Sequence, residues 1–123
     1  MKILHIDDSN LSLKMLRVLL ESHFENTEII SIKPDKYKEH KAKFKKYDMI
    51  IIDLTMPVIS GFEIIEDLKK ENIDIFKVVY SSNVQNIVKK RLSKDINLFL
   101  EKPANKEQIK LLKRMYELWK EKK

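Results

Sequence analysis

The stretch "KYDMIIIDLTMPVISGFE" (46–63) joins a run of apolar residues directly to a negative charge. Residues 49–52 are all apolar, and Asp53 follows them without a break. Consecutive apolar residues without alternation are typical of a strand that is buried on both faces of a parallel sheet. Pro57 and Gly61 indicate that no helix begins at once, so Asp53 does not fit the role of a helix cap. The stretch predicts a central strand that ends on a carboxylate.

Segments with strand-like composition alternate with longer helical patterns along the rest of the chain. The predicted strands are residues 2–6, 28–32, 49–53, 76–81 and 96–100. The predicted helices are residues 11–24, 35–44, 61–71, 83–94 and 105–123. Such alternation predicts a doubly wound α/β fold, with a five-stranded parallel sheet and helices on both faces. We expect the flavodoxin-like (βα)5 strand order 2-1-3-4-5, in one domain that spans residues 1–123.

Local signals support the helices. Ser60 with Glu63, and Asn105 with Gln108, match the pattern of a capping box. Two apolar stripes at helical spacing are expected to face the core. The stripe of the fourth helix is Val84, Ile87, Val88 and Leu92, and that of the last helix is Ile109, Leu112, Met115 or Tyr116, and Trp119.

Composition indicates a soluble globular protein. Its 123 residues are 43% hydrophobic and 36% charged, and the chain has no apolar stretch of membrane-spanning length. The first residues do not resemble a signal peptide, so we expect a cytoplasmic protein without a membrane partner. The absence of cysteine excludes disulfides and thiolate chemistry.

The net charge of +6 comes almost entirely from one segment. Residues 33–46 contain seven lysines against Asp35 and Glu39, whereas the rest of the chain is nearly balanced. The segment contains no arginine, and lysines without interleaved arginine are weak evidence for nucleic-acid recognition. We interpret the segment as a solvated helix face and do not expect a nucleic-acid partner.

Acidic residues follow two of the predicted strands. Asp7 and Asp8 follow the first strand and Asp53 ends the third, and these strands are neighbours in the expected order. Their carboxylates should therefore converge in one cleft, where they would repel one another unless a cation intervenes. An oxygen-only ligand set favours Mg²⁺ over zinc. The histidines are scattered and are interpreted as surface or core residues: His5, His23 and His40.

Four motifs carry a resemblance to a known family. They are "HIDDS" (5–9), "IIIDLTMPVISGFE" (50–63), "VVYSS" (78–82) and "FLEKP" (99–103). In their order and spacing the chain resembles a response-regulator receiver domain over essentially its whole length. The resemblance implies that Asp53 is the phosphoacceptor and that Asp8 and Asp53 ligate Mg²⁺ directly. It also implies that Asp7 acts largely through a metal-bound water and that the backbone carbonyl of Thr55 completes the protein ligands.

The same resemblance assigns roles around the phosphoacceptor. Lys102 would pair with the phosphoryl oxygens, and its bond to Pro103 resembles the cis peptide of the family. Ser81 matches the switch hydroxyl that moves towards the phosphate, and Phe99 matches the aromatic residue whose rotamer reports the switch. Extra negative charge and acceptor oxygens on the aspartate are signals that a nearby hydroxyl and ammonium can read.

Some positions depart from the family's pattern. Ser60 stands where an aspartate is frequent, Lys77 where many receivers have proline, and Ser82 where alanine or glycine is usual. Thr55 and Asn83 occupy the two variable positions that tune the lifetime of the phosphoryl group in this family.

The resemblance implies a stand-alone response regulator of a two-component system, without an output domain. It would be phosphorylated by a sensor histidine kinase and would bind a target through its fourth helix, fifth strand and fifth helix. It is not an enzyme in the usual sense, although it would catalyse its own phosphorylation and dephosphorylation. Alternatives are a phosphorelay intermediate that passes the phosphoryl group to a histidine phosphotransfer protein, a non-phosphorylated pseudo-receiver scaffold, and a receiver cut from a longer regulator. A phosphohydrolase would need a second aspartate two residues after Asp53, where Thr55 stands.

Overall fold

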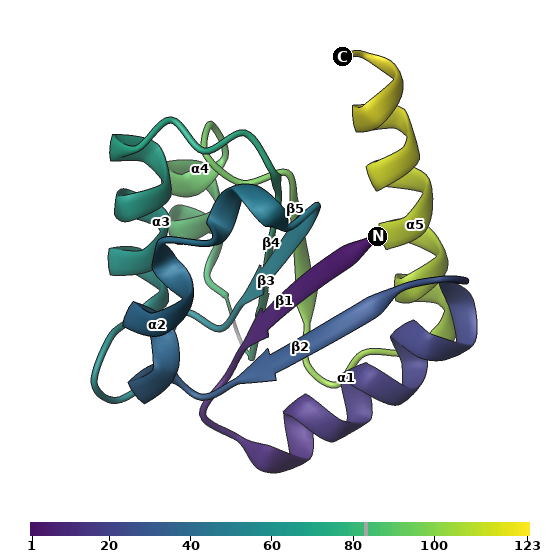
Figure 1. Cartoon of the computed structure of the whole chain (residues 1–123), viewed down its shortest axis with the longest axis horizontal. Helices are drawn as coiled ribbons and strands as arrows, with labels where there is room; N and C mark the ends of the chain where they lie inside the picture. Colours follow the sequence, from purple (N-terminus) through teal and green to yellow (C-terminus); the bar gives the residue numbers. More distant parts are fainter. Residues whose placement is uncertain (83) are drawn as a thin grey trace.

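The sheet has the predicted topology. The computed structural model describes residues 1–82 and 84–123 and contains five parallel strands in the order β2-β1-β3-β4-β5 (Figure 1). The strands are β1 (Lys2–Ile6), β2 (Glu28–Ile32), β3 (Met49–Ile52), β4 (Phe76–Ser81) and β5 (Leu98–Glu101). Every strand boundary lies within two residues of its prediction, and the flavodoxin-like order is confirmed.

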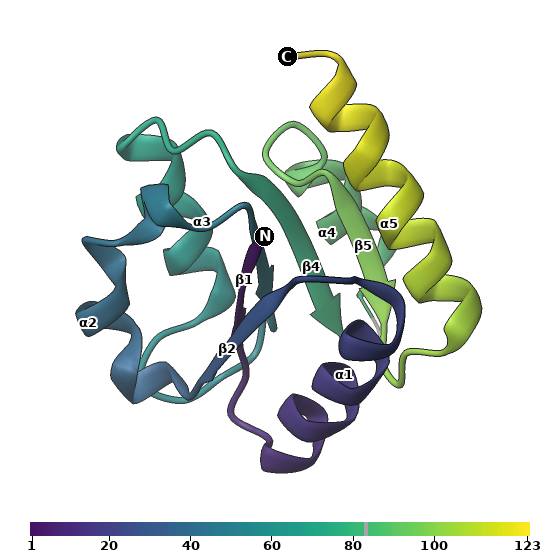
Figure 2. The same ribbon diagram turned by 45° about the vertical axis from the view of Figure 1, so that its right-hand side comes forward.

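Helices cover both faces of the sheet, as the doubly wound prediction requires. Helices α1 and α5 lie on one face, and α2, α3 and α4 lie on the other (Figures 1 and 2). Their bounds are α1 (Asn10–His23), α2 (Tyr37–Lys41), α3 (Gly61–Lys70), α4 (Asn86–Leu92) and α5 (Lys106–Glu121). No helix in the described part of the chain combines the length and apolar character that crossing a membrane requires.

Strand β3 contributes to both cores of the protein, and all four of its residues are buried. Because side chains alternate along a strand, Ile50 and Ile52 pack under α2 and α3, whereas Met49 and Ile51 pack under α1 and α5. This two-sided burial explains the uninterrupted apolar run in the sequence. It also fixes the register of the strand that carries Asp53 at its end.

Gly61 closes the loop that follows Asp53. A methyl side chain at Gly61 would lie 2.3 Å from the carbonyl oxygen of Asp53 and 2.7 Å from the Cα of Leu54. The Gly61 amide donates to the Leu54 carbonyl at 3.0 Å, and the Ser60 hydroxyl caps α3 by accepting from the Glu63 amide at 3.3 Å. The only glycine in the sequence therefore stands where the start of a helix must approach the backbone of Asp53 closely.

Helix α5 begins and packs as predicted. The side chain of Asn105 accepts from the Gln108 amide at 2.9 Å, and that of Gln108 accepts from the Asn105 amide at 3.3 Å. Both bonds of the capping box are therefore present. Ile109, Leu112 and Tyr116 are buried between the helix and the sheet.

The second helix differs from its prediction. Residues 35–44 do not form one helix, because 3-10 turns at Pro34–Lys36 and Phe44–Lys46 flank the short α2. Neither turn has a side-chain cap. The segment is instead held by buried aromatic rings: Tyr37 packs on Phe44 and donates from its hydroxyl to Asp67 of α3 at 2.6 Å. Tertiary anchoring, and not helix propensity, determines its path.

The lysine-rich segment 33–46 is exposed to solvent, as expected. Its buried residues alternate with lysines that point outward, and two of its lysines pair with acidic residues: Lys36 with Glu39, and Lys41 with Asp67. The exposed lysines are Lys33, Lys36, Lys38, Lys43, Lys45 and Lys46. Their outward position agrees with a solvated face, although that face is not one helix.

The fourth helix is shorter than predicted, and part of its apolar stripe is wrong. Ile87 is 71% exposed, and none of the seven described residues of α4 is buried. Val88 and Leu92 reach the core in part, and Val84 does so from the loop before the helix. Because the helix begins after Val84, the helical spacing counted from that residue does not hold. Asn83 lies outside the described residues.

Candidate functional site

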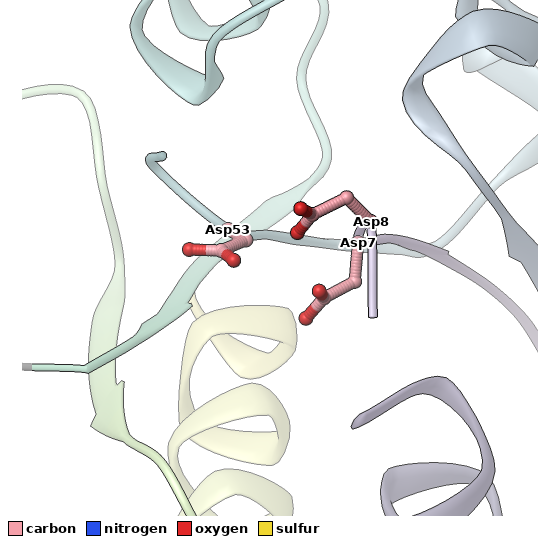
Figure 3. Close-up of side chains that lie close together, drawn as sticks. All are labelled: Asp7, Asp8 and Asp53. Carbon is pink, nitrogen blue, oxygen red and sulfur yellow. The ribbon is translucent and has the colours of Figure 1, made fainter. Parts of the chain in front are cut away.

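Three carboxylates meet at the carboxyl ends of β1 and β3 (Figure 3). The two strands are paired in parallel, with Ile6 opposite Ile52, so the residues that follow them lie side by side. Asp7 and Asp8 follow β1, and Asp53 follows β3. One oxygen of each carboxylate lies within 4.8 Å of the others. The predicted convergence is confirmed.

The cluster is accessible on one side only. Asp7 is fully buried and Asp53 is 6% exposed, whereas Asp8 faces solvent. Three carboxylates this close repel one another unless a cation is near. Their oxygen atoms are hard donors of the kind that Mg²⁺ prefers, and the solvent side leaves room for the waters that Mg²⁺ retains. The donor set therefore fits Mg²⁺.

Lys102 lies between two of the carboxylates. Its Nζ is 2.7 Å from Oδ2 of Asp7 and 3.0 Å from Oδ2 of Asp53, and its side chain is 15% exposed. It reaches this position because β5 pairs with β4 and the Lys102 amide donates to the Ser81 carbonyl at 3.1 Å. The peptide bond between Lys102 and Pro103 is cis, as the family resemblance implied.

These contacts determine the charge state of the site. Burial by itself would lower the pKa of Lys102, but hydrogen bonds to Asp7 and Asp53 outweigh burial and hold this pKa above its usual value. Burial by itself would raise the pKa of Asp7, yet the neighbouring His5, the Lys102 ammonium and the Ser9 amide hold it below its usual value. At neutral pH Lys102 is therefore cationic and Asp7 is anionic.

Ser81 and Thr55 contact the other oxygen of Asp53. The Ser81 hydroxyl, buried at the end of β4, donates to Oδ1 of Asp53 at 2.5 Å. The Thr55 amide approaches the same oxygen at 3.4 Å. Both oxygens of Asp53 thus have donors: Ser81 on Oδ1 and Lys102 on Oδ2.

Phe99 lies apart from the carboxylates. It pairs with Val79 in the sheet and is partly buried against the core under α2, α3 and α4. It lines a hollow of about 200 Å³ that also touches Val84, Lys89 and Gln108. The structure therefore places Phe99 between α4 and α5 and not beside Asp53.

His5 adjoins the site, which the sequence analysis did not foresee. Its side chain is fully buried, and its Nε2 lies 3.7 Å from Oδ2 of Asp7. Neither ring nitrogen has a hydrogen-bond partner among the described residues. The available signal was strand alternation, which places residues 5 and 7 on the same side of β1. His23 and His40 lie elsewhere, in α1 and α2.

Comparisons with known proteins agree with this geometry. A family model described as the response regulator receiver domain matches residues 3–114. The chain is 35% identical over 89 residues to a protein-glutamate methylesterase/protein-glutamine glutaminase of Clostridium acetobutylicum, a match that covers 72% of this chain and 26% of that protein. It is also 35% identical over 72 residues to the sensor protein EvgS of Escherichia coli K12, covering 58% of this chain and 6% of that protein.

A solved structure agrees in fold as well. The chemotaxis response regulator CheY4 of Vibrio cholerae superimposes with a TM-score of 0.77 at 24% identity, over 93% of this chain and 97% of that one. The chain spans only about a quarter or less of the two curated relatives above, so the likeness concerns one domain of each. The family model covers nearly all of the described sheet and helices, and on that evidence the chain belongs to the response regulator receiver domain family.

Proposed function

We propose that this receiver is a phosphorylation switch in which Asp53 accepts a phosphoryl group from a sensor histidine kinase. The observation that carries the proposal is the setting of Asp53. Its carboxylate lies with those of Asp7 and Asp8 at one edge of the sheet, and Lys102 and Ser81 donate to its two oxygens. Phosphoryl transfer depends on positioning and on charges that offset repulsion, and a carboxylate cluster that can hold Mg²⁺, together with an ammonium and a hydroxyl at Asp53, can supply both.

In the transfer, an oxygen of Asp53 attacks the phosphorus of a phosphohistidine. A P–O bond forms while the P–N bond breaks, and the donor imidazole leaves with the electron pair. Both reactants carry negative charge, so their repulsion must be offset. When bound, Mg²⁺ supplies positive charge to the phosphoryl oxygens, and Asp7, Asp8, Asp53 and the backbone carbonyl of Thr55 would hold it.

The residues around Asp53 are suited to detect the new group. A phosphoryl group adds negative charge and acceptor oxygens, and the nearest donors already touch the carboxylate: Lys102 at 3.0 Å and Ser81 at 2.5 Å. Phosphorylation replaces these two bonds with bonds to phosphoryl oxygens. We assign Ser81 and Phe99 to the switch, because a changed contact at Ser81 moves the end of β4 and Phe99 lies beside that strand.

The surface next to the site suits a helical phosphodonor. Leu11, Met15 and Val18 of α1 are 67%, 44% and 64% exposed. Their spacing of four and three residues places them on one face of the helix, which begins two residues after Asp8. An apolar helix face beside the phosphoacceptor fits a partner helix that presents its histidine.

A second apolar surface suits a target protein. Ile87 of α4 is 71% exposed, and Leu111 and Leu118 of α5 are 46% and 44% exposed. The hollow that Phe99 lines lies between these helices. Phe99 lines this hollow and belongs to β5, so it links the surface to the sheet. The proposed switch would therefore alter what the surface binds.

Incubation with acetyl phosphate and Mg²⁺ tests the proposal. Intact-mass measurement should detect one added phosphoryl group on the wild-type protein and on Asp35→Asn, an exposed control, but none on Asp53→Asn. Chelation of Mg²⁺ should prevent the addition. A wild-type protein that gains no mass and binds no Mg²⁺ would be a pseudo-receiver scaffold, which contradicts the proposal.

The choice between two roles depends on the partner. A phosphorelay intermediate would return the phosphoryl group from Asp53 to a histidine phosphotransfer protein. A chemotaxis-type regulator would keep it while it holds a target. Mixing the phosphorylated protein with each partner and following the label separates the roles. Two further points stay predictions. The reading frame of the gene tests whether the receiver stands alone as residues 1–123, and cell fractionation tests whether it acts in the cytoplasm.

A further inference from the structure

We infer that His5 is a positioning residue for Asp7: its Nε2–H takes over Oδ2 of Asp7 when Lys102 turns to the phosphoryl group on Asp53. The inference rests on the proposed function and adds to it a residue that the family resemblance does not assign. It follows from the burial of His5, from the distances around Asp7, and from the two donors that share one oxygen.

The first observation is that His5 is buried without partners. It lies near the carboxyl end of β1 with no exposed surface, and neither ring nitrogen has a hydrogen-bond partner among the described residues. A buried polar group without a partner destabilises a fold. The nearest ring, that of Tyr80, is 6.0 Å away between centroids, and the Tyr80 hydroxyl already accepts from the Ala104 amide. The ring nitrogens of His5 therefore make no hydrogen bond to the described residues in this arrangement.

The second observation is the direction of the ring. Residues 5 and 7 share one side of β1, and Nε2 of His5 is 3.7 Å from Oδ2 of Asp7. This distance is about 1 Å beyond a hydrogen bond to a carboxylate. Whether neutral or protonated, an imidazole can carry an N–H on Nε2. The tautomer with the proton on Nε2 directs it at Asp7.

The third observation is that Lys102 occupies the oxygen that His5 faces. Oδ1 of Asp7 accepts from the Ser9 amide at 3.0 Å, so that oxygen has a fixed partner. Oδ2 has Lys102 Nζ at 2.7 Å, and the same ammonium contacts Oδ2 of Asp53 at 3.0 Å. Lys102 thus contacts two carboxylates, whereas Asp7 has a fixed hydrogen bond on Oδ1 and an ammonium contact on Oδ2 that can be lost.

Phosphorylation of Asp53 determines which oxygen atoms Lys102 contacts. A phosphoryl group on Asp53 offers the ammonium more negative charge than Asp7 does. Oδ2 of Asp7 accepts no hydrogen bond among the described residues, so when Lys102 leaves, this buried anionic oxygen also loses its contact with a cation, and Nε2 of His5 lies 3.7 Å from it. A shift of the ring by about 1 Å makes the bond. Asp7 then keeps its orientation towards Asp8 and the metal while Lys102 pairs with the phosphoryl group.

The test compares His5→Val, His5→Gln and Ile3→Val in the full 123-residue chain. Glutamine keeps an N–H donor, valine removes it, and Ile3→Val shortens a buried side chain elsewhere on β1. The probe is Mg²⁺ with beryllofluoride, a mimic of an aspartyl phosphate. We expect His5→Val to bind about tenfold more weakly than wild type, as outer-shell partners of metal ligands do. His5→Gln and Ile3→Val should bind close to wild type.

Stability distinguishes positioning from packing. Valine removes unsatisfied polar atoms from the core, so His5→Val should unfold at a temperature equal to or above that of wild type, and His5→Gln below it. The order of stability is then the reverse of the order of binding, which a purely structural role of His5 does not produce. Equal binding by His5→Val and wild type would overturn the inference and leave the proposed function intact.

Spectroscopy of the wild-type protein supplies an independent readout. Nitrogen NMR of the His5 side chain should show a solvent-protected Nε2–H when beryllofluoride and Mg²⁺ are added. An Nε2 that stays without a bonded proton in the liganded state would overturn the inference, even if a variant failed to fold. A wild-type protein that binds neither Mg²⁺ nor beryllofluoride would overturn the proposed function, and this inference with it.

Discussion

Replacing Lys102 with methionine should expose how much the receiver depends on one ammonium group. Methionine keeps an apolar stem of similar length and removes the charge. In the wild-type protein Nζ lies 2.7 Å from an oxygen of Asp7 and 3.0 Å from an oxygen of Asp53, and both carboxylates are almost entirely buried. The substitution therefore leaves two buried carboxylates next to each other without their shared cation.

The size of the loss follows from the burial of the pair. Removing one partner of a buried ion pair costs about 3–5 kcal/mol. Lys102 retains some contact with solvent and Asp8 opens the site on one side, so we expect the lower end, about 3 kcal/mol in the free energy of unfolding. Lys69→Met is the matched control, because Lys69 is 61% exposed and 3.9 Å from Asp95. Such surface pairs contribute about 0–1 kcal/mol.

Added Mg²⁺ should reduce this loss. A cation at the three carboxylates replaces part of the missing positive charge, and any ligand that binds only the folded state stabilises it, by about 2.7 kcal/mol at a hundred times its dissociation constant. Urea unfolding of Lys102→Met and wild type, with and without Mg²⁺, measures both effects. A loss below about 1 kcal/mol without Mg²⁺ would refute the assignment of a buried ion pair. If Mg²⁺ does not reduce the difference in unfolding free energy between Lys102→Met and wild type, the carboxylate cluster is not the Mg²⁺ site.

Three further expectations concern the loop and the charges of the site. Gly61→Ala should destabilise the protein by about 2 kcal/mol and weaken Mg²⁺ binding, because the new methyl group meets the backbone of Asp53; urea unfolding and Mg²⁺ titration measure this. Val58→Asn should raise the melting temperature by relieving about 1 kcal/mol of strain, since Val58 has a φ of 71° and asparagine tolerates that conformation. The pKa of Asp7 is lowered in the folded state, so its contribution to stability is complete above about pH 3.9 and is lost as the pH falls through the folded value. The pKa of Lys102 is raised, so its contribution is complete below about pH 10.4 and is lost as the pH rises through the folded value. The free energy of unfolding measured across this pH range should fall at both the acid and the alkaline end. The fall at the acid end should be smaller in Asp7→Asn.

The sheet and the carboxylate cluster could be predicted because both depend on local patterns. Residues 49–52 are apolar at every position, which a strand buried on both faces requires. Asp7, Asp8 and Asp53 each follow a strand, and parallel strands end at the same edge. Once the strand order is known, their convergence needs no information on side-chain conformation.

The errors arose where tertiary packing overrides local pattern. Residues 35–44 contain enough helix-forming residues to suggest one helix, but the buried rings of Tyr37 and Phe44 determine the backbone there. In α4, Ile87 has the right spacing for a core position yet is exposed, because the short helix rests on the sheet by only part of its surface. Spacing alone does not show how deeply a helix packs.

Two features of the site required coordinates. A lysine before a proline can be a solvated strand end, and only distances show that Lys102 bridges Asp7 and Asp53. A lone histidine in a strand is most simply a core residue, and its burial, its missing partners and its distance to Asp7 connect His5 to the site. Both depend on contacts between residues far apart in the sequence or on side-chain direction.

Locating the phosphoryl group is the most direct test of the central claim. Borohydride reduces an aspartyl phosphate to homoserine, which changes the mass of the peptide that contains it. After treatment with acetyl phosphate and Mg²⁺, we expect homoserine at position 53 in the wild-type protein and at no position in Asp53→Asn. Homoserine at Asp7 or Asp8, or at no residue of the wild-type protein, would show that Asp53 is not the phosphoacceptor.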